Sequence, residues 1–140
     1  HHQGGWMKKI KILIVDDEIA ICRLLQDYLE GLGFETCVAT NGEQALELLL
    51  TEKPAIMTLD IRMPGLNGYE VLQKAKRRHP ELFIIVVTGI DVPNMDETLE
   101  HSGAHALLQK PIDLQKLSDT ICEFVGICCK PFLNKGIGDD

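Results

Sequence analysis

The segment Ile56-Met57-Thr58-Leu59-Asp60 decides the fold class of this chain, together with the residues that follow it. It is apolar except for one threonine, which predicts a buried strand that delivers a carboxylate to the carboxyl edge of a sheet. Met63–Gly68 follows and is rich in loop formers. A second segment, Ile12–Val15, has the same construction and runs into Asp16-Asp17-Glu18. Two strands that end in carboxylates suggest a cation site, and a cation beside a carboxylate suggests phosphate chemistry.

Apolar runs and helical patterns alternate five times along the chain. The predicted strands are Lys9–Val15, Phe34–Ala39, Ile56–Leu59, Phe83–Val87 and Ala106–Leu108. The predicted helices are Ile19–Leu32, Glu43–Thr51, Tyr69–His79, Asp96–His101 and a last one with apolar positions from Leu114 to Cys128. This alternation predicts an α/β fold in which parallel strands are joined by right-handed crossovers. We therefore expect a doubly wound, three-layer sandwich with helices on both faces of the sheet.

The size and composition of the chain predict one packed domain. It has 140 residues, of which 45% are hydrophobic. We expect residues 1–6 to be a tag remnant, residues 7–129 to form the domain, and residues 130–140 to be a tail or the start of a linker. The net charge of -7 argues against sequence-independent binding of nucleic acid. No run approaches the ~20 apolar residues of a membrane span, so no membrane association is expected.

The five cysteines favour a reducing compartment. Their number is odd, and no pair has the spacing of a zinc site. Free thiols in the cytoplasm are therefore expected rather than a disulfide framework. Cys22, Cys37 and Cys122 are predicted to act as small hydrophobic core residues, whereas Cys128 and Cys129 lie near the carboxyl end.

Polar residues follow several of the predicted strands, and in parallel sheets ligands bind outside the carboxyl ends of the strands. Asp16, Asp17, Asp60 and Thr88 all lie at such ends. If the first and third strands are neighbours, their carboxylates converge, and two carboxylates ~4 Å apart repel by roughly 4 kcal/mol at an effective dielectric of about 20. A divalent cation would relieve this repulsion, and oxygen ligands favour Mg²⁺, with Mn²⁺ as a substitute. Lys110 follows the last strand and would add a positive charge.

Each of these residues also has an ordinary structural interpretation. The Asp16-Asp17 pair could cap the first helix, and Asp60 could be a turn residue. Lys110 alone could be a surface lysine, and Thr88 alone a hydroxyl at a strand end. Their joint occurrence at one sheet edge favours phosphoryl transfer onto an aspartate, which requires a carboxylate nucleophile, a metal, a lysine and a hydroxyl group.

The order of these acidic, hydroxyl and amino residues resembles the receiver domains of two-component response regulators. The resemblance extends from about Lys9 to Cys128 and rests on four motifs. They are Ile12–Glu18, Thr58–Gly68, Val86–Gly89 and Leu108–Pro111. It implies a flavodoxin-like (βα)₅ fold with a five-stranded parallel sheet of order 2-1-3-4-5.

The resemblance also implies a function and a role for each site residue. A sensor histidine kinase or a phosphotransfer protein would pass a phosphoryl group to Asp60, and the domain would act as a switch rather than an enzyme. Its output partner would bind the face of the fourth helix, fifth strand and fifth helix, and the chain would be a monomer or a phosphorylation-dependent dimer. The implied roles are Mg²⁺ binding by Asp17, Asp60 and the Arg62 backbone carbonyl, contact of Asp16 with the metal through water, and binding of the phosphoryl oxygens by Thr88 and Lys110.

Some positions depart from the pattern of this family. Leu107 stands where an aromatic residue is usual, which puts the usual coupling between threonine and aromatic ring in doubt. Apolar Ile90 cannot orient an attacking water, which predicts slow loss of the phosphoryl group, and a dephosphorylation rate would check this. The resemblance further implies a cis bond between Lys110 and Pro111.

Two alternatives stay open from the sequence. One is a receiver-like binding module that works without phosphorylation. The other is a Mg²⁺-dependent aspartyl phosphatase of the haloacid dehalogenase type, which would need a second carboxylate at the position of Arg62.

Overall fold

A computed structural model describes residues 9–62, 68–89 and 101–126 of the chain. The strands are β1 (Lys11–Val15), β2 (Glu35–Ala39), β3 (Ile56–Asp60), β4 (Phe83–Thr88) and β5 (Ala106–Gln109). The helices are α2 (Ile19–Gly31), α3 (Gly42–Thr51), α4 (Gly68–Arg78) and α6 (Leu114–Val125). Within the described residues, no helix combines the length and the apolar composition needed to cross a membrane.

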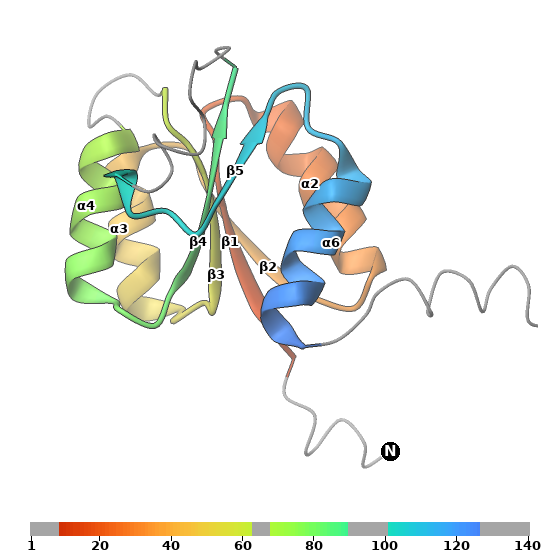
Figure 1. The fold of residues 1–140 in the computed structure, drawn as a ribbon, viewed down its shortest axis with the longest axis horizontal. Coiled ribbons are helices and arrows are strands. Elements are labelled where there is room, and N and C mark those ends of the chain that lie inside the picture. Colours follow the sequence, from red (N-terminus) through yellow and green to blue (C-terminus); the bar gives the residue numbers. More distant parts are fainter. Residues whose placement is uncertain (1–8, 63–67, 90–100, 127–140) are drawn as a thin grey trace, which may run out of the picture.

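The five strands form one parallel sheet in the order β2-β1-β3-β4-β5, with α3 and α4 on one face and α2 and α6 on the other (Figure 1). This confirms both the doubly wound α/β prediction and the strand order that the family resemblance implied. In the register, Val15 pairs with Leu59, and Asp60 pairs with Val87. The carboxyl ends of β1, β3 and β4 are therefore aligned at one edge of the sheet.

The side chains of β1 show how the sheet divides the core into two parts. Leu13 and Val15 pack on the side of α3 and α4, whereas Ile12 and Ile14 pack on the side of α2 and α6. These four side chains are at most 1% exposed, and full burial of each contributes about 1.5–3 kcal/mol. Strands without polar alternation are covered on both faces, as the sequence predicted.

Three strands extend one residue beyond their predicted ends, so that β3, β4 and β5 end at Asp60, Thr88 and Gln109. The strands are longer than predicted because backbone hydrogen bonds between neighbouring strands continue past the apolar runs. The Ile61 N–H donates to the Val87 carbonyl over 3.1 Å, and the Lys110 N–H donates to the Thr88 carbonyl over 2.8 Å. Asp60 and Thr88 thus belong to the ends of strands rather than to loops.

The last helix is shorter than predicted, because α6 ends at Val125 and does not continue to Cys128. Gly126 adopts a left-handed conformation with φ of 75°, and its N–H donates to the Cys122 carbonyl. Glycine takes this conformation without a steric penalty and so ends the helix. Of the predicted helix Asp96–His101, only His101 is described. Ile90, Cys128, Cys129 and the two terminal segments 1–6 and 130–140 also lie outside the described residues.

Cys22 and Cys122 are buried, and Cys37 is half-buried. The Cys22 thiol donates to the Asp16 carbonyl over 3.2 Å, and burial raises its pKa to about 11. Cys22 and Cys37 are free thiols, as predicted. Cys122 packs in the core as predicted, but it is disulfide-bonded, which contradicts the expectation of a free thiol at this residue.

Gly68 is the point at which α4 packs against the end of β3. Its N–H donates to the Ile61 carbonyl over 3.2 Å, and a Cβ atom at Gly68 would lie 2.5 Å from Ile61 Cα and 2.7 Å from the Asp60 carbonyl oxygen. Because these are backbone atoms, Gly68→Ala is expected to displace the chain after Asp60 and to cost at least about 1 kcal/mol in chemical denaturation. Gly31→Ala is the matched control, since a Cβ there meets nothing within 4 Å. Equal stability of the two variants would contradict this packing argument.

Candidate functional site

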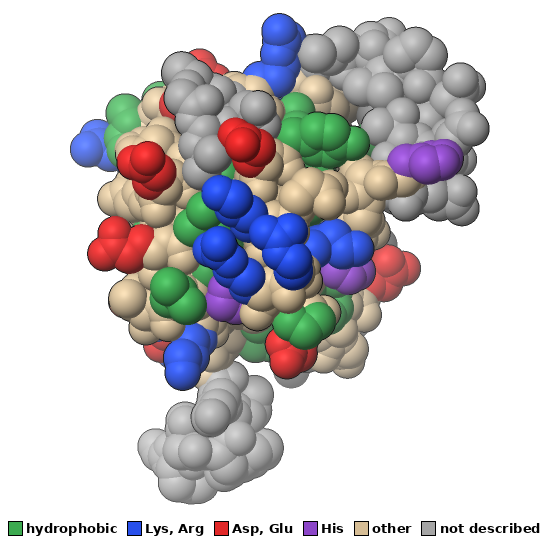
Figure 2. Space-filling model, turned by 90° about the vertical axis from the view of Figure 1, so that its left-hand side faces the viewer, with side chains coloured by type: hydrophobic (Ala, Val, Ile, Leu, Met, Phe, Trp, Pro, Cys, Tyr) green, Lys and Arg blue, Asp and Glu red, His purple; other side chains and the backbone are tan. Residues whose placement is uncertain are grey.

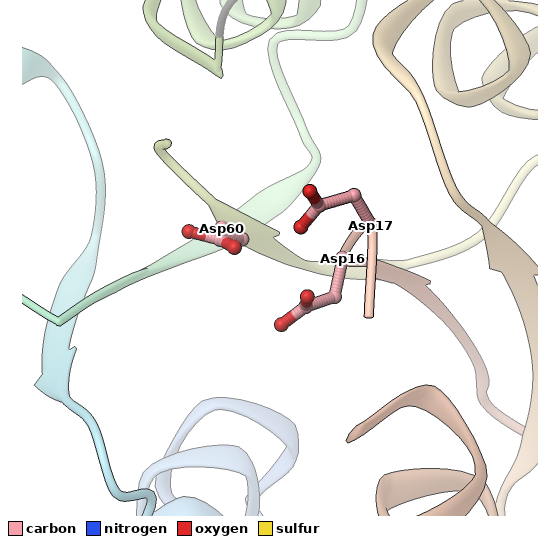
Figure 3. Close-up of side chains that lie close together, drawn as sticks. All are labelled: Asp16, Asp17 and Asp60. Atoms are coloured by element: carbon pink, nitrogen blue, oxygen red, sulfur yellow. The ribbon is translucent and has the colours of Figure 1, made fainter. Parts of the chain in front are cut away.

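Three carboxylates meet at the carboxyl edge of the sheet, as Figure 3 shows. Asp60 ends β3, and Asp16 and Asp17 follow β1, where the Asp16 N–H donates to the Ala39 carbonyl and continues the pairing of β1 with β2. One oxygen from each of the three side chains lies within 4.8 Å of the others. Asp16 and Asp60 are only 3% and 5% exposed, whereas Asp17 is exposed. The cluster is therefore a buried pair of carboxylates with a third at its solvent side.

Lys110 supplies the positive charge of the site. Its Nζ lies 3.0 Å from Asp16 Oδ2, 3.3 Å from Asp60 Oδ2 and 3.3 Å from Glu18 Oε1. Burial by itself would lower the pKa of Lys110, but the hydrogen bonds and charges of Asp16 and Asp60 outweigh it and raise the pKa above its ordinary value. The ammonium group therefore stays charged at neutral pH and is shared among three carboxylates.

The environment of Asp60 disfavours its charged form. Burial raises the pKa of this carboxyl above its ordinary value, and the neighbouring charge of Asp16 acts in the same direction. The N–H of Arg62, which donates to Asp60 Oδ1 over 3.0 Å, and the ammonium group of Lys110 oppose the shift without cancelling it. The protein alone thus compensates the charge at Asp60 incompletely, which is the condition under which an added cation binds favourably.

The donor set suits a small, hard cation. All three side chains offer carboxylate oxygens, which Mg²⁺ prefers at about 2.0–2.1 Å, so that ligands on opposite sides of the ion are roughly 4 Å apart. Oxygens within 4.8 Å of one another reach that spacing with side-chain adjustments of less than about 1 Å. The acidic cluster could therefore bind a metal.

The structure brings the other predicted residues to the same edge. Thr88 ends β4, is 3% exposed, and accepts the Lys110 backbone hydrogen bond. The Lys110–Pro111 bond is cis, as the resemblance implied. Glu18 is a member of the site that the sequence did not predict, although its place directly after Asp16-Asp17 was a signal. Metal binding by the Arg62 carbonyl stays a prediction.

Leu107 occupies the position at which the family usually has an aromatic residue. It pairs with Val86 across β4 and β5 and is half-buried against the core on the side of α3 and α4. This side chain has no ring and no hydroxyl group, so it offers only apolar packing at this position.

Comparison with known proteins agrees with this geometry. The response regulator receiver domain family matches residues 12–122. The chain is 32% identical over 119 residues to the sporulation initiation phosphotransferase F of Bacillus subtilis, covering 85% of this chain and 96% of that protein. It is 36% identical to the transcriptional regulatory protein ZraR of Klebsiella oxytoca, covering 83% of this chain but only 26% of that protein. Much of the length of ZraR therefore has no counterpart here.

The fold has counterparts among solved structures. A CheY-like response regulator receiver domain protein from Methanospirillum hungatei superposes with a TM-score of 0.79 and 30% sequence identity, over 85% of this chain and 95% of that one. The receiver domain of a DNA-binding response regulator from Colwellia psychrerythraea superposes with a TM-score of 0.78 and 27% identity, over 84% and 99%. With its sheet order, its cluster of aspartates beside Lys110 and its match over residues 12–122, the chain belongs to the response regulator receiver domain family of two-component signalling.

Proposed function

We propose that Asp60 accepts a phosphoryl group from the phosphohistidine of a sensor kinase or a phosphotransfer protein, with Mg²⁺ bound at the acidic cluster. The observation that carries this proposal is the position of Asp60, a buried carboxylate within 4.8 Å of two others and 3.3 Å from Lys110 Nζ. Asp17, Asp60 and the backbone carbonyl of Arg62 would hold the ion directly, and Asp16 would do so through water.

In this step an oxygen of Asp60 attacks the phosphorus atom in line with the leaving nitrogen. The new bond joins oxygen and phosphorus, the phosphorus–nitrogen bond of the phosphohistidine breaks, and its electron pair returns to the imidazole. Lys110 exchanges part of its pairing with Asp60 for a phosphoryl oxygen, and the hydroxyl of Thr88 donates to another. Asp17, Asp60 and the Arg62 carbonyl would hold a Mg²⁺ ion, which would supply positive charge between Asp60 and the incoming group. Positioning and charge compensation thus supply the catalysis, and no separate general base is required.

The switch would act through the strand ends that touch the site. Thr88 is linked to Lys110 by a backbone hydrogen bond, so movement of either residue reaches the start of the segment between β5 and α6. The side chain of Leu107 has no aromatic ring that could rotate and no group that could form a hydrogen bond. Output would therefore depend on displacement of the backbone rather than on rotation of this side chain. The proposed output face comprises the predicted fourth helix Asp96–His101, of which only His101 is described, together with β5 and α6, and it would bind a partner or an output domain.

Phosphorylation by a small phosphodonor tests the proposal. Incubation with acetyl phosphate and Mg²⁺ is expected to add the mass of one phosphoryl group, located on the peptide that contains Asp60. Removal of divalent cations with EDTA should prevent the reaction, as should Asp60→Asn. Asp27→Asn removes an exposed carboxylate from α2 and is the matched control, which should react like the parent.

The other hypotheses predict different results in the same experiment. A binding module that works without phosphorylation would show no mass gain at all. A phosphatase would turn over a phosphate ester with release of inorganic phosphate. Either outcome would exclude the proposed receiver function.

A further inference from the structure

A hollow of about 350 Å³ lies at the opposite edge of the sheet from the acidic cluster. Pro54 and Ala55 line it just before β3 begins, and Leu82 lines it just before β4 begins. Asp60 is the last residue of the five-residue strand β3, so this hollow is separated from Asp60 by roughly 16 Å of strand. The full lining comprises Leu49, Leu50, Lys53, Pro54, Ala55, His79, Glu81 and Leu82.

The hollow offers an apolar binding surface that is open to solvent. Leu50 lines the hollow and is 61% exposed. Leu49 and Leu82 are buried beneath it, at 1% and 4% exposure. One apolar side chain of a partner would therefore contact Leu49, Leu50 and Leu82 in this hollow.

Positive charge is concentrated next to this hollow. His79, which lines it, directly follows the last turn of α4. Figure 2 shows Lys and Arg side chains gathered on the face that α4 presents. Five of the 14 Lys and Arg residues of the chain lie on α4 or in the lining, compared with two of its 21 Asp and Glu residues, Glu70 and Glu81. The five are Lys53, Lys74, Lys76, Arg77 and Arg78.

The packing of α4 leaves these basic residues available. Val71, Leu72 and Ala75 are 0% exposed and form the side of the helix that faces the core. Lys76, Arg77 and Arg78 are exposed, and Lys74 is half-buried.

Lys53 is held at the hollow in a conformation that lysine rarely adopts. Its φ is 48°, in the left-handed region, directly after the residue that caps α3. Glycine or asparagine takes this conformation at lower cost. Lys53 thus places a cationic side chain at a position where the left-handed backbone favours glycine or asparagine.

We propose that the hollow and the basic end of α4 form a docking surface for an acidic polypeptide segment that inserts one apolar side chain between Leu50 and Leu82. The segment's carboxylates pair with Lys53 and the basic residues of α4. The segment is negatively charged and the patch is positively charged. The chain as a whole carries a net charge of -7 and would repel the segment elsewhere. This complementarity fixes where such a segment binds.

A nucleic acid fits the same surface less well. It carries charge along its whole length, and beyond the Debye length of about 8 Å from the patch it would meet a chain whose net charge is -7. A short acidic segment stays within the patch and avoids this repulsion. The proposed contact does not involve Asp60, so it is independent of the proposed phosphorylation.

Nuclear magnetic resonance with a defined peptide tests the proposal. The probe is a short synthetic peptide in which one leucine is flanked by glutamates and aspartates, titrated into the ¹⁵N-labelled full chain. Amide shifts are expected at Leu50, Lys53, His79 and Leu82. The affinity should fall roughly tenfold in the double variant Lys53→Asn with Arg78→Gln, and also when the leucine of the peptide is replaced by serine.

The controls separate this surface from the phosphorylation site and from general charge attraction. Lys116→Gln removes an exposed lysine from α6 and should leave the affinity unchanged. Asp60→Asn should also leave it unchanged, so failure of the proposed receiver function would not affect the result. Three outcomes would overturn the proposal: no shifts at the hollow, equal binding by the double variant, or tighter binding of an oligonucleotide of the same charge through the same residues.

Discussion

Replacement of Lys110 by methionine is expected to lower the free energy of unfolding by about 3 kcal/mol in metal-free buffer. The substitution leaves Asp16 and Asp60, at 3% and 5% exposure, without their shared cation. Removal of one partner from a buried ion pair typically costs ~3–5 kcal/mol, because the remaining charge is left uncompensated. We expect the lower end of this range, since the Lys110 side chain is itself 20% exposed and solvent screens part of the interaction.

Lys11→Met provides a control of the same chemistry at the surface. Lys11 Nζ lies 2.7 Å from Glu52 Oε1, a shorter distance than any in the Lys110 cluster, but both side chains are substantially exposed. Solvent screening makes such pairs weak, so chemical denaturation should show a much smaller loss than for Lys110→Met. If the two variants lost equal stability, burial would not be what gives the Lys110 cluster its strength.

Mg²⁺ should reduce the loss in the Lys110→Met variant. A divalent ion at the acidic cluster would replace the missing ammonium charge and would bind only the folded chain. The increase in unfolding free energy with added Mg²⁺ is therefore expected to be larger for Lys110→Met than for the parent. An equal increase would argue that the ion and Lys110 do not compensate the same carboxylates.

Replacement of Asp60 by asparagine is expected to have the opposite effect and to stabilise the metal-free protein by about 2 kcal/mol. Two carboxylates ~4 Å apart repel by roughly 4 kcal/mol, of which we expect Lys110 to offset about half. Asparagine removes this repulsion and keeps an oxygen that can accept the Arg62 N–H. Lys110 keeps its shorter pairing with Asp16 at 3.0 Å. Thermal unfolding in EDTA should show a higher midpoint for Asp60→Asn than for the parent.

The pH dependence gives a second test of the same variant. The pKa of Asp60 in the folded chain is raised, so the stability gained by its protonation is fully present below the ordinary carboxyl pKa of ~3.9. That stability is lost as the pH rises through the higher folded-state pKa. The advantage of Asp60→Asn should therefore be largest at neutral pH and should shrink on acidification. An advantage that stayed constant between neutral and acidic pH would show that repulsion at Asp60 is not its cause.

Local sequence patterns were sufficient for the fold class, whereas the strand order came from the family resemblance. The apolar runs before Asp16 and Asp60, and the helical spacing between them, predicted the alternating elements and the parallel sheet. The ends of β3, β4 and β5 were placed one residue too early, because the pattern of apolar residues gives no information on backbone hydrogen bonds that extend past the apolar run. The end of α6 was placed too late, because apolar spacing continued past Gly126, whose left-handed conformation ends the helix.

The sequence by itself determined which side chains stand at strand ends, and hence that Asp16, Asp17, Asp60, Thr88 and Lys110 belong to one edge. A strand pattern depends on neighbours a few residues away, and these are visible in the sequence. Only the tertiary structure decided that Lys110 lies closer to Asp16 than to Asp60, that Glu18 joins them, and that Lys53 and His79 line one hollow. Such distances follow from strand register and side-chain rotamers, which are fixed when the whole core packs.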